Sequence, residues 1–179
     1  MPISERPYFF KYCKKDEWSE WKEDDCQSRC LTKSKGVIIK RRSCKQRTFN
    51  TTKCEGSYYA VDLCDDSNIC NIRTTIEEFS NTKCTKFSLI LKKNHQNFDN
   101  IMKLGWKASY NPKKPSEACT IFCLRVAFTS SRYISPYSEL VNFGVNPYLP
   151  DGTWCHNENG QDYYCRQHYC LPENYSVKG

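Results

Sequence analysis

The chain has 179 residues and a formal net charge of +7 at neutral pH. Only 39% of the residues are hydrophobic, the mean hydropathy is −0.76, and no stretch approaches the roughly 18 apolar residues of a membrane span. These figures argue against a large apolar core and against membrane insertion, so we expect covalent staples to supply what the core lacks.

Cysteine accounts for 13 residues, a share typical of disulfide-bonded extracellular proteins. Cys13 stands apart, which indicates a free thiol, an intermolecular bridge or an alternative pairing. The other cysteines fall into two sets by spacing: Cys26, Cys30, Cys44, Cys54, Cys64 and Cys70, then Cys84, Cys119, Cys123, Cys155, Cys165 and Cys170.

We therefore predict a small, disulfide-rich, secreted protein of two modules. Two glycosylation sequons, at Asn50 and Asn174, agree with secretion. The expected divisions are an N-terminal segment at 1–12, a first module at 13–71, a connector at 72–83, a second module at 84–172 and a tail at 173–179.

The first module is predicted to be a thin ribbon of extended segments. Period-two spacing places Lys40 and Arg42 on one strand face, together with Ile38. The rings of Trp18 and Trp21 can lie over these cations, each contact contributing about 0.5–2 kcal/mol. Three segments read as extended: 18–25, 36–45 and 57–64.

This module resembles a thrombospondin type 1 repeat, since the paired tryptophans, the basic strand and all six cysteines occur in the family's order. The resemblance implies a three-stranded antiparallel ribbon, and it places C-mannosylation at Trp18. Arg29 stands where the family's fucosylated Ser or Thr would be, so O-fucose is not expected. The implied bridges are Cys26–Cys64, Cys30–Cys70 and Cys44–Cys54.

A second pattern within the same family has a cysteine five residues before the first tryptophan, as Cys13 is here. That variant pairs Cys13 with Cys54 and leaves Cys44 free. The segment from Cys54 to Cys64 fits the first pairing better, so we prefer a bridge between Cys44 and Cys54.

The second module has weaker local patterns. Residues 96–106 read as a short helix, and residues 119–128 and 140–145 as strand or helix. Cys119 and Cys123, four residues apart, would share one side of a helical turn and reach two different elements. Asp151-Gly152 is a turn signal.

The order of these motifs resembles the start of the cysteine-rich domain of the ADAMTS metalloproteases, which follows a thrombospondin repeat in that family. The endings Leu149-Pro150-Asp151-Gly152-Thr153 and Cys170-Leu171-Pro172-Glu173-Asn174 are also similar to ixostatin-type secreted proteins of tick saliva. The resemblance implies an irregular α+β module with the bridges Cys84–Cys123, Cys119–Cys165 and Cys155–Cys170.

The sequence offers no recognisable catalytic site. It has three histidines and no His-Glu-x-x-His, so the zinc-protease motif is missing. Cys155, Cys165 and Cys170 resemble a metal-ligand run, but an oxidising compartment favours disulfides. We expect neither enzymatic activity nor a metal or other cofactor.

A basic stretch suggests a polyanionic partner. Between residues 29 and 53 there are nine Lys or Arg and no acidic residue. Arg41, Lys45 and Arg47 are the expected contacts for a heparin-like glycosaminoglycan. Alternatively, acidic residues in 16–25 neutralise this charge across strands. Nucleic acid is not expected for an exported chain.

The stretch between Cys123 and Cys155 matches the variable, substrate-contacting region of the ADAMTS domain. Arg132, Tyr133 and Tyr137 are the expected contacts with a host extracellular or cell-surface protein, since Arg and Tyr are enriched in interface hot spots. The alternative is that these aromatic side chains pack inside the module.

We therefore expect a secreted, non-catalytic binding protein, in the tick-saliva interpretation a modulator of host haemostasis, angiogenesis, complement or immunity. The alternatives are an ancillary, substrate-recognising fragment of a longer secreted zinc metalloprotease and a structural protein of the extracellular matrix. An upstream reading frame with the zinc motif would indicate the fragment. A signal peptide directly before this start would indicate the stand-alone protein.

Overall fold

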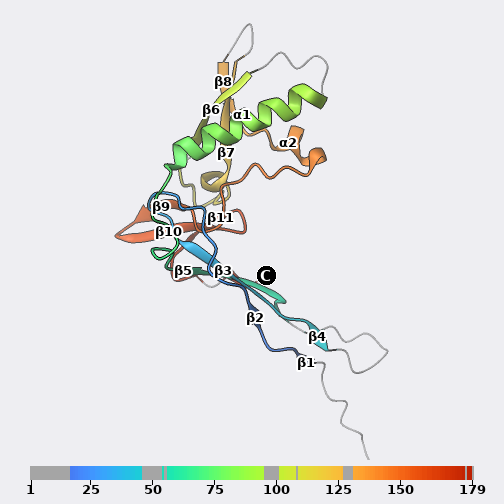
Figure 1. The fold of residues 1–179 in the computed structure, drawn as a ribbon, viewed down its shortest axis with the longest axis vertical. Coiled ribbons are helices and arrows are strands. Elements are labelled where there is room, and N and C mark those ends of the chain that lie inside the picture. Colours follow the sequence, from blue (N-terminus) through green and yellow to red (C-terminus); the bar gives the residue numbers. More distant parts are fainter. Residues whose placement is uncertain are drawn as a thin grey trace, which may run out of the picture.

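The computed structural model describes residues 17–45, 54, 56–94, 101–107, 109–126, 131–175 and 177–178. Cys13, Arg47 and Asn50, three of the predicted site residues, lie outside this part of the chain. The described molecule is elongated, with narrow strands towards one end and the helix α1 (Ile76–Asn94) towards the other (Figure 1). Within the described residues, no helix combines the length and apolar character needed to cross a membrane.

The three extended segments predicted for the first module are confirmed as antiparallel strands. One sheet has the order β12-β5-β3-β2, and a short pair joins β1 to β4. Residues 177–178, which we predicted as part of a tail, supply a fourth strand, since Val177 pairs with Val61. The strands are β1 (Glu17–Trp18), β2 (Lys22–Glu23), β3 (Gly36–Arg41), β4 (Cys44–Lys45), β5 (Tyr59–Cys64) and β12 (Val177–Lys178).

Few apolar side chains are buried in the first module. Among its described residues, the buried aliphatic ones are Leu31, Val37, Ala60 and Val61. Each buried Val or Leu side chain contributes about 1.5–3 kcal/mol and each disulfide typically about 2–4 kcal/mol, so the bridges supply a share of the stability comparable to that of this small core. The bridges are Cys26–Cys64, Cys30–Cys70 and Cys44–Cys54, the same pairs that the resemblance implies.

Helix α1 occupies most of the predicted connector and was missed by the sequence analysis. It begins with a capping box: Glu78 N–H donates to Thr75 Oγ1 at 3.1 Å, and Thr75 N–H donates to Glu78 Oε2 at 3.0 Å. Its buried face carries Cys84, Phe87 and Leu91 at helical spacing. Residues 72–83 are therefore a structural part of the second module rather than a passive link.

A three-stranded antiparallel sheet of order β6-β7-β8 packs against α1. The helix predicted at 96–106 is wrong for 101–106, because these residues form strand β6, with Trp106 opposite Phe122 on β7. Pairing with a strand that is distant in sequence decides this conformation, and the local pattern of apolar residues carries no information about that pairing. The strands are β6 (Ile101–Lys107), β7 (Ile121–Val126) and β8 (Ser131–Ile134).

The two neighbouring cysteines do not share a helical turn as predicted. Cys119 ends the 3-10 turn η1 (Glu117–Cys119), and Cys123 lies within β7. They nevertheless reach two different elements, because Cys123 bonds Cys84 on α1 and Cys119 bonds Cys165. Residues 121–126, left open between strand and helix, are strand.

A third sheet, of order β11-β10-β9, completes the second module. Its first hairpin turns at Asn159-Gly160, where both residues have positive φ, as the preferred Asn-Gly turn requires. Part of 140–145, also left open, is helical. The elements are β9 (Trp154–Glu158), β10 (Gln161–Arg166), β11 (Tyr169–Pro172), α2 (Tyr137–Leu140) and the 3-10 turn η2 (Val141–Phe143).

Disulfides form a large part of the second module's core. All six of its cysteines belong to the buried cluster, alongside Phe87, Leu91, Ile121 and Leu140. The sulfur atoms of Cys119, Cys155 and Cys170 lie within 4.8 Å of one another because two bridges pack together, and each of them is bonded to another sulfur atom. The bridges are Cys84–Cys123, Cys119–Cys165 and Cys155–Cys170, again the implied pairs, and none of the six joins the two sets.

Candidate functional site

The predicted stack in the first module contains one cation between two indole rings. The Arg42 guanidinium carbon lies 4.3 Å from the Trp18 ring centre and 4.4 Å from that of Trp21. Arg42 Nε also donates to the carbonyl of Ser57 at 2.6 Å, which fixes the guanidinium plane. The arrangement stabilises a ribbon that has almost no apolar core on this side.

The predicted place of Lys40 in this stack is wrong. Lys40 Nζ lies 2.7 Å from Glu23 Oε1 and 3.0 Å from Asp62 Oδ2. Glu23 is directly opposite on β2, and Asp62 is diagonal on β5, so carboxylates on both neighbouring strands reach the ammonium group. The hydrogen bond with Glu23, followed by that with Asp62, raises the pKa of Lys40.

Replacing Arg42 with alanine should destabilise the protein by about 1–3 kcal/mol, because both indole contacts and the bond to Ser57 are lost. Arg41→Ala is the neighbouring control: its exposed ion pair with Asp24, at 3.0 Å, is worth about 0–1 kcal/mol. Urea unfolding followed by tryptophan fluorescence measures both. Equal losses for the two variants would show that the stack does not stabilise the ribbon.

The basic ribbon, the strands that carry Lys40, Arg41 and Lys45, is partly neutralised by its own neighbours. Arg41 pairs with Asp24, and Lys45, although exposed, lies opposite Glu17 in the pairing of β1 with β4. Arg47 lies outside the described residues. Cross-strand neutralisation, the alternative we considered, therefore holds for Lys40 and Arg41 and leaves this surface a weaker attraction for polyanions than its sequence predicts.

Two of the three predicted partner-binding residues lie on a strand and the third begins a helix, so none of them lies on a loop. Arg132 and Tyr133 belong to β8, an edge of its sheet, and both are exposed, Tyr133 by 46%. Tyr137 begins α2, and its side chain is outside the description. Arg132 lies opposite Arg125, whose guanidinium reaches Glu139 at 3.4 Å. Arg132 and Tyr133 are consecutive residues of β8, so their side chains point to opposite faces of the sheet.

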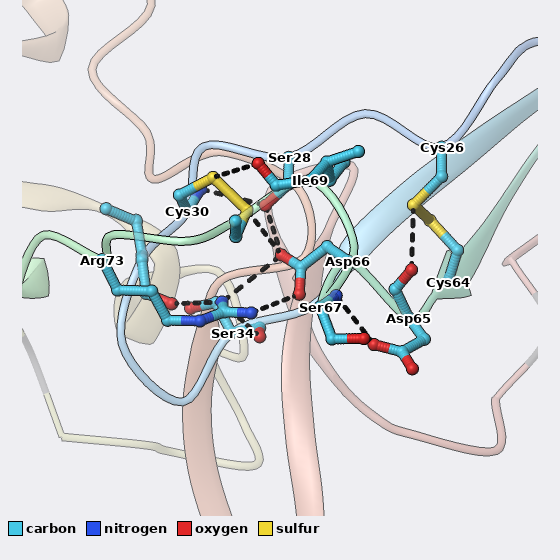
Figure 2. The surroundings of a disulfide bond; sticks show 12 residues. Cys26, Ser28, Cys30, Ser34, Cys64, Asp65, Asp66, Ser67, Ile69 and Arg73 are labelled. Atoms are coloured by element: carbon cyan, nitrogen blue, oxygen red, sulfur yellow. Dashed lines mark hydrogen bonds and ion pairs between the residues drawn. A yellow bond between two sulfur atoms is a disulfide. The ribbon is translucent and has the colours of Figure 1, made fainter.

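A buried carboxylate organises the end of the first module nearest the second. Asp66 is only 3% exposed and accepts hydrogen bonds from Ser28 Oγ and, at 2.6 Å, from Arg73 (Figure 2). Arg73 also donates to the backbone carbonyls of Leu31 and Ser34. Burial opposes ionisation, but the bonds from Arg73 and Ser28 outweigh it, so the pKa of Asp66 is lowered. This network holds the loop that faces the second module.

The two modules meet through backbone and charged contacts that the sequence did not reveal. Lys35 N–H donates to Gly152 O at 3.0 Å, and Trp154 N–H donates to Ser34 Oγ at 3.0 Å. Lys35 Nζ also pairs with Glu173. These bonds join residues more than a hundred positions apart, so the two modules are docked against each other. Gly152, predicted only as part of a turn, is one of the residues that make this contact.

A groove of about 390 Å³ lies along this junction. Arg29 and Val37 line it from the first module, and Leu149 and His168 line it from the second. His168 stacks on Tyr148 with ring centres 4.0 Å apart. The walls of the groove come from segments that converge only in the folded chain, so no local sequence signal identifies it.

The remaining predicted modification sites are exposed or partly exposed. Asn174 lies in the turn after β11, and its Oδ1 accepts a hydrogen bond from Gln161 at 2.9 Å. Trp18 is partly buried against Arg42. Glycosylation of Asn174 and mannosylation of Trp18 stay predictions.

No protein-family model matches the chain, and no curated protein matches it significantly. Any assignment of function therefore rests on the residues and the geometry described above.

Proposed function

We propose that this chain is a secreted, non-catalytic binding protein. In this proposal a thrombospondin-like ribbon precedes an ADAMTS-like cysteine-rich module, without a protease. The observation that carries it is the disulfide framework: six bridges join the same pairs that the two resemblances imply. Arg42 between two indoles supports the same assignment for the first module.

The proposed mechanism is occupation of a host extracellular or cell-surface protein through β8. β8 ends its sheet within the described residues, and exposed Tyr133 and Arg132 offer side chains of the kind found in interface hot spots. A scaffold pinned by disulfides lowers the ordering cost of binding. As a protein similar to those of tick saliva, it would modulate host haemostasis, angiogenesis, complement or cellular immunity.

The first experiment is to identify the partner. Correctly oxidised protein is immobilised and exposed to plasma and to endothelial or leukocyte surface extracts, and captured proteins are identified by mass spectrometry. A single host protein that binds the purified chain directly, at stoichiometric level, supports the proposal. Chelator-sensitive cleavage of a captured protein by the purified chain would instead contradict a non-catalytic role.

The Arg132→Ala, Tyr133→Ala, Tyr137→Ala variant should weaken binding to the identified partner by more than about 2 kcal/mol, since hot-spot residues carry most interface energy. The matched control replaces Lys113, Tyr58 and Tyr169 with alanine, which removes a cation and two exposed tyrosines elsewhere. Surface plasmon resonance compares the two folded variants. If both bind as tightly as the parent, the β8 surface is not the contact.

A further inference from the structure

Helix α1 carries a second cationic surface that neither the basic stretch nor the resemblances indicated. After its first turn the helix contains four lysines and no acidic residue. Lys92 and Lys93 lie in the last turn, where cations compensate the helix dipole. Lys83 and Lys86 lie mid-helix, where that explanation does not apply. Three residues apart, they are neighbours on the helix surface, and like charges at this spacing destabilise a helix.

Arg29, the first residue of the basic stretch, extends this surface from the first module. Thr74 N–H donates to Cys30 O at 2.9 Å, which ties the Arg29 loop to the start of α1. The loop is further anchored by the bridge between Cys30 and Cys70. Burial first, and then the charges of Lys86 and Arg29, lower the pKa of Lys83. We call Arg29, Lys83 and Lys86 the basic cluster.

No carboxylate neutralises the basic cluster within the described residues, since none of their ion pairs includes one of its members. Glu77 and Glu78, the acidic residues of α1, lie in its first turn, and Glu78 is engaged with Thr75. Arg29 and Lys86 are exposed, and Lys83 is half-buried with its ammonium 5.4 Å from the Phe79 ring centre. The basic ribbon, by contrast, has paired its Lys40 and Arg41.

We propose that the basic cluster binds a sulfated extracellular polysaccharide. Lys93 continues the row of cations, because it lies seven residues, or about two turns, beyond Lys86 on the same helix. From Lys83 to Lys93 the row follows α1 over about 15 Å. A row of this kind suits a linear polyanion. Anionic lipid faces the cytoplasm in most membranes, whereas six disulfides indicate an oxidising compartment, which favours a polysaccharide over a lipid surface. The proposal relies on the extracellular location proposed above but not on β8.

The test compares two variants that lose the same charge. One replaces Arg29, Lys83 and Lys86 with glutamine, and the other replaces Arg41, Lys45 and Arg47. We expect the first variant to bind heparin about tenfold more weakly at moderate salt, with a shallower salt dependence, because three direct sulfate contacts are lost. The ribbon variant should stay near the parent. Desulfated heparin should bind neither the parent nor the variants.

Equal losses in the two variants would mean that net charge alone governs retention, and a loss only in the ribbon variant would return the site to the ribbon; either result overturns the proposal. The proposal would also be overturned if the variant of Arg29, Lys83 and Lys86 lost binding to phosphatidylserine vesicles but retained heparin like the parent; the cluster would then bind a lipid surface. A Lys83→Arg, Lys86→Arg variant, which keeps both charges, should bind heparin like the parent and guards against misfolding. Since β8 is untouched, host-protein binding should persist in every variant.

Discussion

Replacing Gly152 with alanine is expected to undock the two modules and to destabilise the protein by about 3–5 kcal/mol. Gly152 has φ +85°, a conformation that L side chains rarely adopt. A Cβ at this position would overlap the Lys35 carbonyl oxygen and come within 3.2 Å of its carbon. That backbone cannot retreat without breaking its own hydrogen bond to Gly152.

Gly160→Ala is a control matched in conformation. Gly160 has φ +82°, but nothing lies within 4 Å of a Cβ built there, so only the conformational strain of about 1–2 kcal/mol applies. Denaturant unfolding gives both values, and amide exchange reports opening at Lys35 N–H. Similar losses in the two variants, with Lys35 still protected, would show that the junction is not tightly packed.

Replacing Asp66 with alanine should cost about 2–4 kcal/mol, because it leaves Arg73 and Ser28 without their shared acceptor. Asp65→Ala is the neighbouring control: the Asp65 side chain is exposed and accepts a hydrogen bond from Ser67 N–H within its own turn, so a much smaller effect is expected. Urea unfolding at neutral pH compares the variants. An equally stable Asp66→Ala protein would mean that the network does not stabilise the loop.

The same carboxylate should make stability fall in acid. Its pKa in the folded protein is below the ordinary value of about 3.9, so its stabilising effect is fully present above about pH 4 and is lost as the pH falls through the folded value. Asp66→Asn removes this ionisation, and its unfolding free energy should therefore vary less between about pH 5 and pH 2. An identical acid profile in the parent and in this variant would contradict the assignment.

Local sequence was informative wherever the structure depends on residues close together in the chain. The strands of the first module follow from alternation and β-branched residues, and the place of Arg42 follows from its period-two position near Trp18 and Trp21. Helix α1 also had a local signal, since Thr75 and Glu78 form a capping box before apolar residues at helical spacing. The assignment of 72–83 as a connector did not use this signal.

Other features had no local signal at all. Residues 101–107 form a strand because β7 pairs with them, and Lys40 leaves the indoles because Glu23 and Asp62 arrive from two other strands. The three predicted partner contacts include two on one edge strand, which spacing from Cys123 does not specify. In each case the deciding group is distant in sequence, and a pattern confined to neighbours carries no information about it.

The sequence by itself determined the disulfide-rich class, the two cysteine sets and the stacked arginine, because cysteine number and short-range alternation are properties of the chain. Only the tertiary structure decided how the modules dock at Gly152, which lysines are neutralised and where the basic cluster forms. Those features depend on distances between backbone segments far apart in sequence. Close packing and Coulomb interactions depend on how near two groups lie in space, whatever their separation along the chain.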